Sequence, residues 1–310
     1  MAMIVVIGSG MAGLACARRL ADAGHAPVVL DKGRGIGGRV ATRRVGNVQF
    51  DHGAQYVNAH GAGFEAVLRS LGERGAVAGW QDSTGRTHSV GVPGMSAIPM
   101  ALGIGLDIRQ QVQVARLVQD GAGWALHMDA GAMRAARVVV TVPAPQVTDL
   151  LGADHPLVAA LALVQFAPCL TLMAAVAGVA PFVTRQDADD PLAWIAQDST
   201  KPGRPQGPDN MWVAQAGEAF SRSHLELTPA QMVTQMLPML CDRLGVTPDR
   251  VTHAAAHRWR HARVTQALGQ PFLRNPDATL YLGGDWCIGP RVEAAWTSGT
   301  AMADDILGRG

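Results

Sequence analysis

The sequence predicts an α/β protein whose core is a parallel sheet of the Rossmann type, and three features of its N-terminal part predict it. Residues 4–7 are four consecutive β-favouring apolar residues, which indicate a strand buried on both faces. Glycines follow at G-x-G-x-x-G spacing over residues 8–13. Residues 14–23 then have the pattern of a helix that ends at Gly24. Strand, glycine turn and helix in this order are typical of a dinucleotide-binding unit.

Each glycine of this turn has its own physical role. Gly8 permits the tight turn, Gly10 lets a pyrophosphate approach the backbone, and Gly13 lets the helix pack close to the strand. Met11 and Ala12 begin the helix, where free N–H groups and the positive end of the helix dipole favour an anion. The turn is therefore predicted to hold a pyrophosphate.

A second strand and a second glycine-rich loop follow. Residues 27–30 indicate the strand, which ends at Asp31, about where a carboxylate binds a ribose hydroxyl. Residues 32–42 are basic and rich in glycine, so Gly38 lets the backbone lie flat against a ligand and Arg39 can meet a pyrophosphate with a two-pronged fork. A plain nicotinamide-binding Rossmann domain does not need this loop. The alternative is a flexible basic loop.

The composition is that of an ordinary globular protein, with 48% hydrophobic and 16% charged residues in a chain of 310. The net charge of +1 gives no electrostatic case for nucleic acid or an anionic membrane. No run approaches the ~20 apolar residues that span a bilayer. The cysteines are Cys16, Cys169, Cys241 and Cys287, with no C-x-x-C pair, so neither a disulfide framework nor a zinc site is expected. The first residues lack a basic leader and contain the glycine turn. We expect a cytoplasmic protein without a bound metal.

The order of strand-like and helix-like stretches predicts two domains. The nucleotide-binding domain is expected to comprise residues 1–58, 96–146 and 275–310, and a discontinuous α+β substrate domain to comprise 59–95 and 147–274. Within the second domain, the loop 198–209 is rich in proline and glycine and is expected to be exposed and mobile.

Together these motifs resemble the FAD-dependent amine-oxidase superfamily, which shares its fold with p-hydroxybenzoate hydroxylase. The matching segments are G-x-G-x-x-G over 8–13, Asp31, G-G-R-x-x-T over 37–42, T-V-P over 141–143 and G-G-D over 283–285. Within the superfamily the chain looks most like the renalase group, especially its bacterial members. The segments behind that likeness are D-H-G-A-Q-Y-V over 51–57, P-A-P-Q over 143–146 and H-R-W-R-H-A over 257–262. The resemblance spans essentially the whole chain.

The resemblance implies FAD as the cofactor. The Gly-Cys-Tyr setting of a covalent flavin cysteine is absent, so the FAD is expected to be non-covalent. Residues 55–57 would line the isoalloxazine, the backbone of Val114 would meet the adenine, and Asp285 would bond a ribitol or phosphate oxygen. The last helix would aim its dipole at the flavin. The residues implied in cofactor binding are Gly8, Gly10, Met11, Ala12, Gly13, Asp31, Lys32, Gly38, Arg39, Gln55, Tyr56, Val57, Val114, Asp285, Arg291, Val292 and Ala294.

The resemblance also implies a reaction. Members of the resembled group oxidise aberrant dihydro isomers of NAD(P)H, the 2- and 6-dihydronicotinamides, to NAD(P)+ by hydride transfer to flavin N5, and O2 is reduced to H2O2. A dihydronicotinamide gives up hydride without first losing a proton, which fits a chain in which no catalytic base stands out. The only tyrosines are Tyr56 and Tyr281, so a paired-tyrosine amine cage cannot be built from tyrosine alone.

A dinucleotide substrate carries a pyrophosphate, so arginines are expected at its site, with Arg258 and Arg260 as further candidates. The substrate candidates are His52, Asn58, Arg185, Trp286 and Arg291. A strand over 256–264 would place His257, Trp259 and His261 on one face, and a helical metal stripe is the disfavoured alternative. The alternative functions are an oxidase of small amines, a flavin-binding redox protein without turnover, and a nicotinamide-only dehydrogenase. The sequence leaves open the isomer, NAD versus NADP, the physiological electron acceptor and the oligomeric state.

Overall fold

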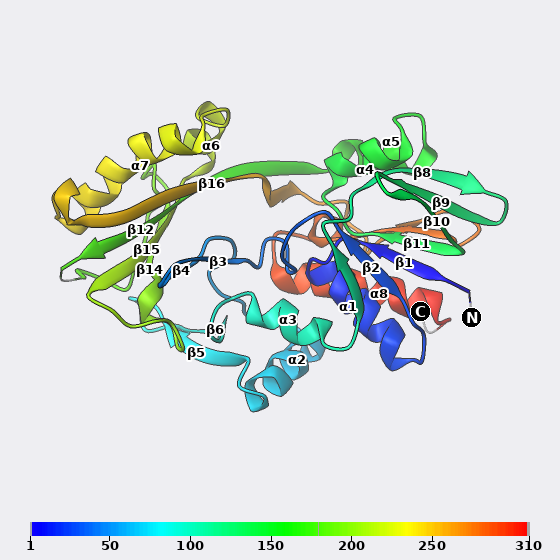
Figure 1. Ribbon diagram of the computed structural model, residues 1–310, viewed down its shortest axis with the longest axis horizontal. Helices are drawn as coiled ribbons and strands as arrows, with labels where there is room; N and C mark the ends of the chain where they lie inside the picture. The colour runs from blue at the N-terminus through cyan, green and yellow to red at the C-terminus, as the bar shows by residue number, and fades with distance from the viewer. Residues whose placement is uncertain (1, 179, 309–310) are drawn as a thin grey trace.

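The computed structural model describes residues 2–178 and 180–308, arranged in two lobes (Figure 1). The described ends of the chain lie on the same lobe, which contains the predicted glycine turn. The outer limits of the predicted nucleotide-binding domain, residues 1 and 310, lie outside the described residues. Two long strands, β12 (Gln165–Ala177) and β16 (Val251–Gln266), run from the second lobe back to the first.

The first lobe is built on a six-stranded sheet. Its strands in spatial order are β17 (Leu273–Arg274), β18 (Leu280–Leu282), β11 (Arg137–Val140), β1 (Ile4–Ile7), β2 (Val28–Asp31) and β7 (Asp107–Gln110). Neighbours pair in parallel except β17, which is antiparallel to β18. All four residues of β1 are buried, because the sheet is covered on both faces. The predicted Rossmann-type α/β fold is confirmed.

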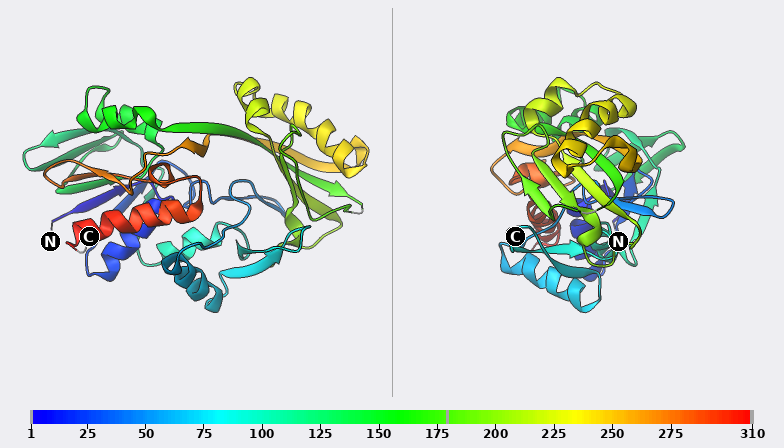
Figure 2. Two further views of the ribbon diagram at one scale, coloured as in Figure 1. Left: turned by 180° about the vertical axis from the view of Figure 1, so that it is seen from behind. Right: turned by 90° about the vertical axis from the view of Figure 1, so that its left-hand side faces the viewer.

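Two helices from opposite ends of the chain cover one face of this sheet. Figure 2 shows α1 (Met11–Asp22) and α8 (Val292–Ile306) side by side. Their close approach requires Gly299, because a Cβ there would collide with the carbonyl oxygen of Ala12. Cys16 and Met302 pack with the strand residues of this face. The N-terminus of α8 is thereby brought near that of α1.

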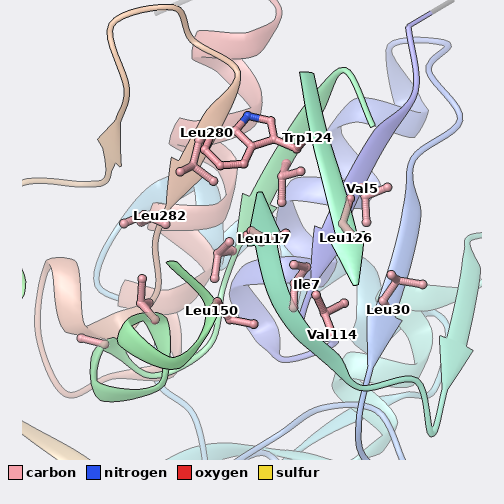
Figure 3. Close-up of a cluster of buried hydrophobic side chains, with 14 of the residues drawn as sticks. Val5, Ile7, Leu30, Val114, Leu117, Trp124, Leu126, Leu150, Leu280 and Leu282 are labelled. Carbon is pink, nitrogen blue, oxygen red and sulfur yellow. The ribbon is translucent and has the colours of Figure 1, made fainter. Parts of the chain in front are cut away.

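A small antiparallel sheet and one helix cover the other face. The sheet contains β8 (Val114–Asp120), β9 (Gly123–Met128) and β10 (Gly131–Ala135), and the helix is α4 (Ala144–Leu151). Figure 3 shows the apolar core between the two sheets, in which Leu117, Trp124 and Leu126 meet Ile7 and Leu280.

The second lobe is a five-stranded antiparallel sheet covered by one long helix. The strand order is β13 (Thr184–Gln186), β14 (Trp194–Gln197), β15 (Asp209–Gln215), β12 and β16. Side chains alternate along β12, so Leu170 and Leu172 pack under α7 (Pro229–Leu244), while Met173 faces the other way. α7 begins with a capping box at Thr228. The face that carries Met173 is partly covered by Phe50 and is turned towards the first lobe.

A linking segment packs against both lobes. It contains β3 (Thr42–Val45), β4 (Val48–Asp51), α2 (Ala62–Glu73), β5 (Val77–Gln81), β6 (Thr87–Gly91) and α3 (Ala97–Gly103). Phe64 and Ile98 of this segment share one apolar cluster with Leu14 of α1 and with Ala196 of β14. Segment 59–95 therefore contacts both parts of the chain, and the predicted division into two domains stays a prediction.

The remaining elements are short. They are α5 (Pro156–Ala159), η1 (Ala160–Leu163), η2 (Asp198–Thr200), α6 (Glu218–Ser223), η3 (Pro248–Arg250) and η4 (Asp285–Cys287). Among the helices of the described residues, none combines the length and the apolar character needed to span a bilayer.

The prediction that loop 198–209 is exposed is wrong for its first half. Asp198, Lys201 and Arg204 are 0%, 1% and 4% exposed. They are buried because they form ion pairs with one another and with Asp51 of β4. The second half, residues 205–208, is exposed as expected.

Candidate cofactor and substrate site

A cavity of about 1390 Å³ lies between the first lobe and the second-lobe sheet, on the face of the sheet opposite to α7. One wall consists of the ends of β1 and β2, the start of α1, the loop after β2 and the start of α8. The other wall comes from β12, β14, β15 and β16. The volume exceeds the roughly 300–1,000 Å³ of a site for one small ligand, so a dinucleotide and a second molecule can be held together.

The fold requires glycine at two positions of the turn, Gly8 and Gly13, but not at Gly10. Gly8 has φ +105°, and a Cβ on Gly13 would collide with the carbonyl oxygen of Gly8. By contrast, no atom of the described chain lies within 4 Å of a Cβ built on Gly10, which forms part of the cavity wall. Gly10 also caps α1 without a side-chain hydrogen bond, which leaves the first-turn N–H groups available to an anion. This cradle fits a pyrophosphate.

The second glycine loop lies directly against the first. The N–H of Gly37 donates to the carbonyl oxygen of Ser9 at 2.8 Å. Gly38 has φ +55°, and a Cβ on it would be 3.5 Å from the Cα of Gly10. The two loops therefore form one continuous backbone surface along the cavity.

The carboxylate of Asp31 is held at the end of β2 by three donors. Its Oδ2 accepts from the backbone N–H and the hydroxyl of Ser9 at 2.6 and 2.7 Å, and its Oδ1 accepts from the N–H of Gly33 at 2.6 Å. A carboxylate has about four acceptor positions, so one stays free for a ribose hydroxyl. Asp31 lines the cavity, as a ribose-binding residue must.

Arg39 and Asp285 meet in the cavity wall. Arg39 Nη1 and Nη2 donate to the two oxygens of Asp285 at 2.8 and 2.7 Å, and Nη1 also donates to the carbonyl oxygens of His261 and Ala262 at 3.2 Å. Burial lowers the pKa of His261, and Arg39 lowers it further. The sequence predicted cofactor contacts for Arg39 and Asp285 separately, and the structure joins them into one unit.

Most residues assigned to the cofactor line the cavity. They are Gly8, Gly10, Met11, Ala12, Asp31, Lys32, Gly38, Arg39, Val114, Asp285, Arg291 and Val292. The other five assigned residues, which do not form part of the wall, are Gly13, Gln55, Tyr56, Val57 and Ala294.

Residues 55–57, which the resemblance places against the isoalloxazine, do not form part of the cavity wall, and Gly53 and Ala54 reach the cavity at this point. The side chain of Gln55 turns inward and donates to backbone carbonyls, while Tyr56 stacks on His88 with ring centroids 3.9 Å apart. Val57 is buried and its N–H donates to the carbonyl oxygen of Ser89. These contacts turn the three side chains away from the cavity.

Four of the five predicted substrate residues lie off the cavity, and Arg291 lines it. Trp286 is 0% exposed and donates to the carbonyl oxygen of Val142, so it packs in the core. Asn58 is hydrogen-bonded to His88. Arg185 pairs with Asp190 at 3.4 Å, which holds it away from the cavity.

His52 is the fourth residue off the cavity. It is 9% exposed and packs against both His257 and Trp259, with ring centroids 5.0 and 5.3 Å away. Burial lowers the pKa of His52 to about 4, with further lowering by His257 and Arg43, so its ring is neutral near pH 7. The expected strand over 256–264 is part of β16.

The second-lobe wall is the part that sequence reasoning largely missed. Trp194 of β14 and Trp259 of β16 both line the cavity, together with Cys169 and Gln215. Burial raises the pKa of the Cys169 thiol to about 11, so it is neutral. A glutamine at the end of the apolar stretch Met211–Gln215 is a signal that could have indicated a polar wall position.

Three arginines of β16 also line this wall, each with a partner. Arg260 forms a two-pronged ion pair with Glu226 at 2.7 Å, and Arg263 pairs with Glu218 at 3.3 Å. Arg258 donates to the carbonyl oxygens of Leu225 and Leu227 at 2.6 and 3.3 Å. Within the described chain, no group of three His, Cys, Asp or Glu side chains is placed to hold a metal ion.

The fold and the cavity define a two-lobed protein with a Rossmann-type lobe, a β-sheet lobe, and a cavity between them that is large enough for a dinucleotide and a second molecule. Residues 6–71 match the NAD(P)-binding Rossmann-like domain, and residues 59–307 match the flavin containing amine oxidoreductase family. The chain therefore belongs to the flavin-containing amine oxidoreductase family, whose members are FAD-dependent oxidoreductases.

Comparison with known proteins supports the same fold over the whole chain. A protein from Exiguobacterium sp. 255-15, provisionally described as a protoporphyrinogen oxidase, superposes with a TM-score of 0.80 at 13% identity, covering 100% of this chain and 99% of that one. Cyclohexylamine oxidase from Brevibacterium oxydans IH-35A superposes with a TM-score of 0.75 at 12% identity, covering 99% of each chain. A 15-cis-phytoene desaturase from Synechococcus elongatus is 50% identical over 38 residues, which span 12% of this chain and 8% of the desaturase.

Proposed function

We propose that this protein is a renalase-like oxidase that converts the 2- and 6-dihydro isomers of NAD(P)H to NAD(P)+. Non-covalently bound FAD supplies the redox chemistry, in which hydride passes to flavin N5 and O2 is reduced to H2O2. The glycine cradle, Asp31 and the Arg39–Asp285 pair are the residues that would hold this cofactor. The observation that carries the proposal is the composition of the opposite wall, where Trp194 and Trp259 lie on the cavity face of the sheet and Arg258 and Arg260 lie on the edge strand β16.

The arginines suit a substrate with a pyrophosphate. Arg258 and Arg260 lie two positions apart on β16, so they project from the same face of this edge strand, opposite to the face that carries Trp259. A guanidinium binds phosphate oxygens with two parallel donors, and a phosphate can exchange with the exposed Glu226 carboxylate at Arg260. A small monoamine offers no group for these cations.

The aromatic residues suit a planar ring. Trp194 and Trp259 present large apolar surfaces to the cavity, and such surfaces stack on planar heteroaromatic rings. Both tyrosines are engaged elsewhere, Tyr56 with His88 and Tyr281 with Asp305 at 2.7 Å. A tyrosine-lined amine site is therefore disfavoured, and a nicotinamide ring is the better fit.

Family membership favours one second candidate, an oxidase of small amines. Anaerobic mixing of the yellow protein with 2- or 6-dihydronicotinamide dinucleotide, and separately with small amines, distinguishes the two. We expect the dihydronicotinamides to bleach the flavin absorbance, and peroxide to form once O2 is admitted. Bleaching by amines alone would establish the second candidate, and no bleaching by either would identify a flavin protein without turnover. Release of all FAD on denaturation would support non-covalent binding.

A further inference from the structure

Four charged side chains are buried together behind the cavity wall. They are Asp51, Asp198, Lys201 and Arg204, and each side chain is at most 1% exposed. Lys201 Nζ lies 2.6 Å from Asp198 Oδ1 and 3.2 Å from Asp51 Oδ2, and Arg204 pairs with Asp51. We call these four residues the ionic cluster. None of them lines the cavity.

The ionic cluster joins segments that are far apart in the chain. Asp51 ends β4, whereas the other three residues belong to η2 and the turn after it in the second lobe. Asp51 also accepts hydrogen bonds from the N–H of Met95 at 2.9 Å and the hydroxyl of Thr42 at 2.7 Å, and its own N–H donates to Asp198. The start of the segment 51–57 is thus fixed from several directions.

Lys201 connects the ionic cluster to the cavity wall. Its third acceptor is the side-chain oxygen of Gln55, at 3.2 Å, so all three of its N–H donors are used. The amide nitrogen of Gln55 in turn donates to the carbonyl oxygens of Asp51 and Gly53. Gly53 and Ala54 form the wall at this point, where the N–H of Ala54 donates to the carbonyl oxygen of Arg39 at 2.8 Å.

Stability alone does not account for this arrangement. Replacing a buried ion pair by apolar residues of similar volume is often neutral or stabilising, because desolvation of the charges offsets their attraction. The two carboxylates hold the Lys201 ammonium group in the position from which it donates to the side-chain oxygen of Gln55. The position of the Gly53–Ala54 turn also has little tolerance. Gly53 packs so tightly on Arg39 that a Cβ on Gly53 would collide with the Arg39 carbonyl oxygen.

We propose that Lys201 is a positioning residue. Held by Asp51 and Asp198, it orients the Gln55 carboxamide, which fixes the Gly53–Ala54 turn against the Arg39 backbone and so shapes the wall on which FAD binds. The proposal rests on membership of the FAD-dependent family and not on the identity of the substrate.

The first test is a variant that keeps the cluster balanced in charge. Lys201→Met with Asp198→Asn removes one positive and one negative charge, leaves the Arg204–Asp51 pair, and keeps an acceptor for the N–H of Asp51. We expect a folded protein in which amide hydrogen exchange over residues 51–57 is about tenfold faster, the size expected for one lost buried hydrogen bond. We also expect weaker FAD binding and a shifted flavin midpoint potential. Exchange, affinity and potential like those of the wild type would overturn the proposal.

The second test keeps the ionic cluster intact. Gln55→Leu should reproduce the faster exchange, and combining it with the double variant should add little, because both changes break the same chain of contacts. Full additivity would show that Lys201 does not act through Gln55. Arg243→Met is the matched control, since it breaks the 2.6 Å pair with Asp190 in the second lobe and should lower stability without changing exchange over 51–57. None of these measurements needs a substrate. A negative result therefore leaves the proposed oxidase function unaffected, and failure of the dihydronicotinamide test leaves the proposed role of Lys201 unaffected.

Discussion

Arg39 and Asp285 form a two-pronged ion pair in the cavity wall, although 246 positions separate them in the chain. The pair fastens the second glycine loop to η4, just before α8 begins. Because Arg39 also donates to two carbonyl oxygens of β16, one guanidinium connects both walls of the site. The alignment of these walls therefore depends on the fork geometry of arginine as well as on its charge.

Replacing Arg39 by lysine tests this dependence. Arg39→Lys keeps the positive charge but loses the parallel donors, so we expect FAD to bind about tenfold more weakly. Titration of the apoprotein with FAD measures the change. Arg109→Lys is the control, because its pair with Asp107 is exposed and lies on β7. Equal loss in both variants would show that the fork at Arg39 has no special role.

Two alanine substitutions in the glycine turn should have opposite consequences. Gly10→Ala meets no described atom and keeps an ordinary backbone conformation, so the protein should fold with nearly unchanged stability but lose FAD affinity. Gly13→Ala collides with the Gly8 carbonyl oxygen and should destabilise the protein by several kcal/mol, on the order of the overpacking cost. Thermal unfolding and FAD titration on both variants measure this. A Gly10→Ala variant with full FAD affinity would contradict the assigned cradle.

Removing Arg260 should affect dinucleotides selectively. With Arg260→Met we expect the KM for a dihydronicotinamide dinucleotide to rise about tenfold, the effect of one lost charge-assisted contact, while the kcat changes little. The corresponding mononucleotide, which has one phosphate fewer, should be affected less. Steady-state kinetics with both substrates provide the measurement, and an equal effect on the two would place the phosphates elsewhere.

Stability should rise with pH between about 4 and 6.5, in part because of His52. Burial lowers the pKa of His52 from 6.5 to about 4 in the folded protein, so the unfolded chain binds more protons across this range and unfolding is favoured as the pH falls. His52→Phe removes that proton uptake and should flatten the dependence of Tm on pH. Parallel melting curves of variant and wild type at several pH values test this. An unchanged slope would assign the dependence to other groups, such as His257 and His261.

Much of the first lobe could be predicted from patterns formed by residues that lie close together in the sequence. The strand over 4–7, the glycine turn and Asp31 were recognised because turn chemistry and burial on both faces leave a pattern within about thirty residues. For the same reason most of the assigned cofactor residues line the cavity.

Tertiary contacts decided what local pattern could not. The segment 198–204 has the composition of an exposed loop, and only its pairing with Asp51, about 150 positions away, makes the burial of Lys201 possible. Trp286 follows Asp285 directly, yet the 3₁₀ turn sends one side chain to the cavity and the other into the core. Chain neighbours alone do not determine where a side chain points. The sequence by itself therefore determined the nucleotide-binding unit, because its signals are local, whereas the second wall and the ionic cluster required the packing of distant segments.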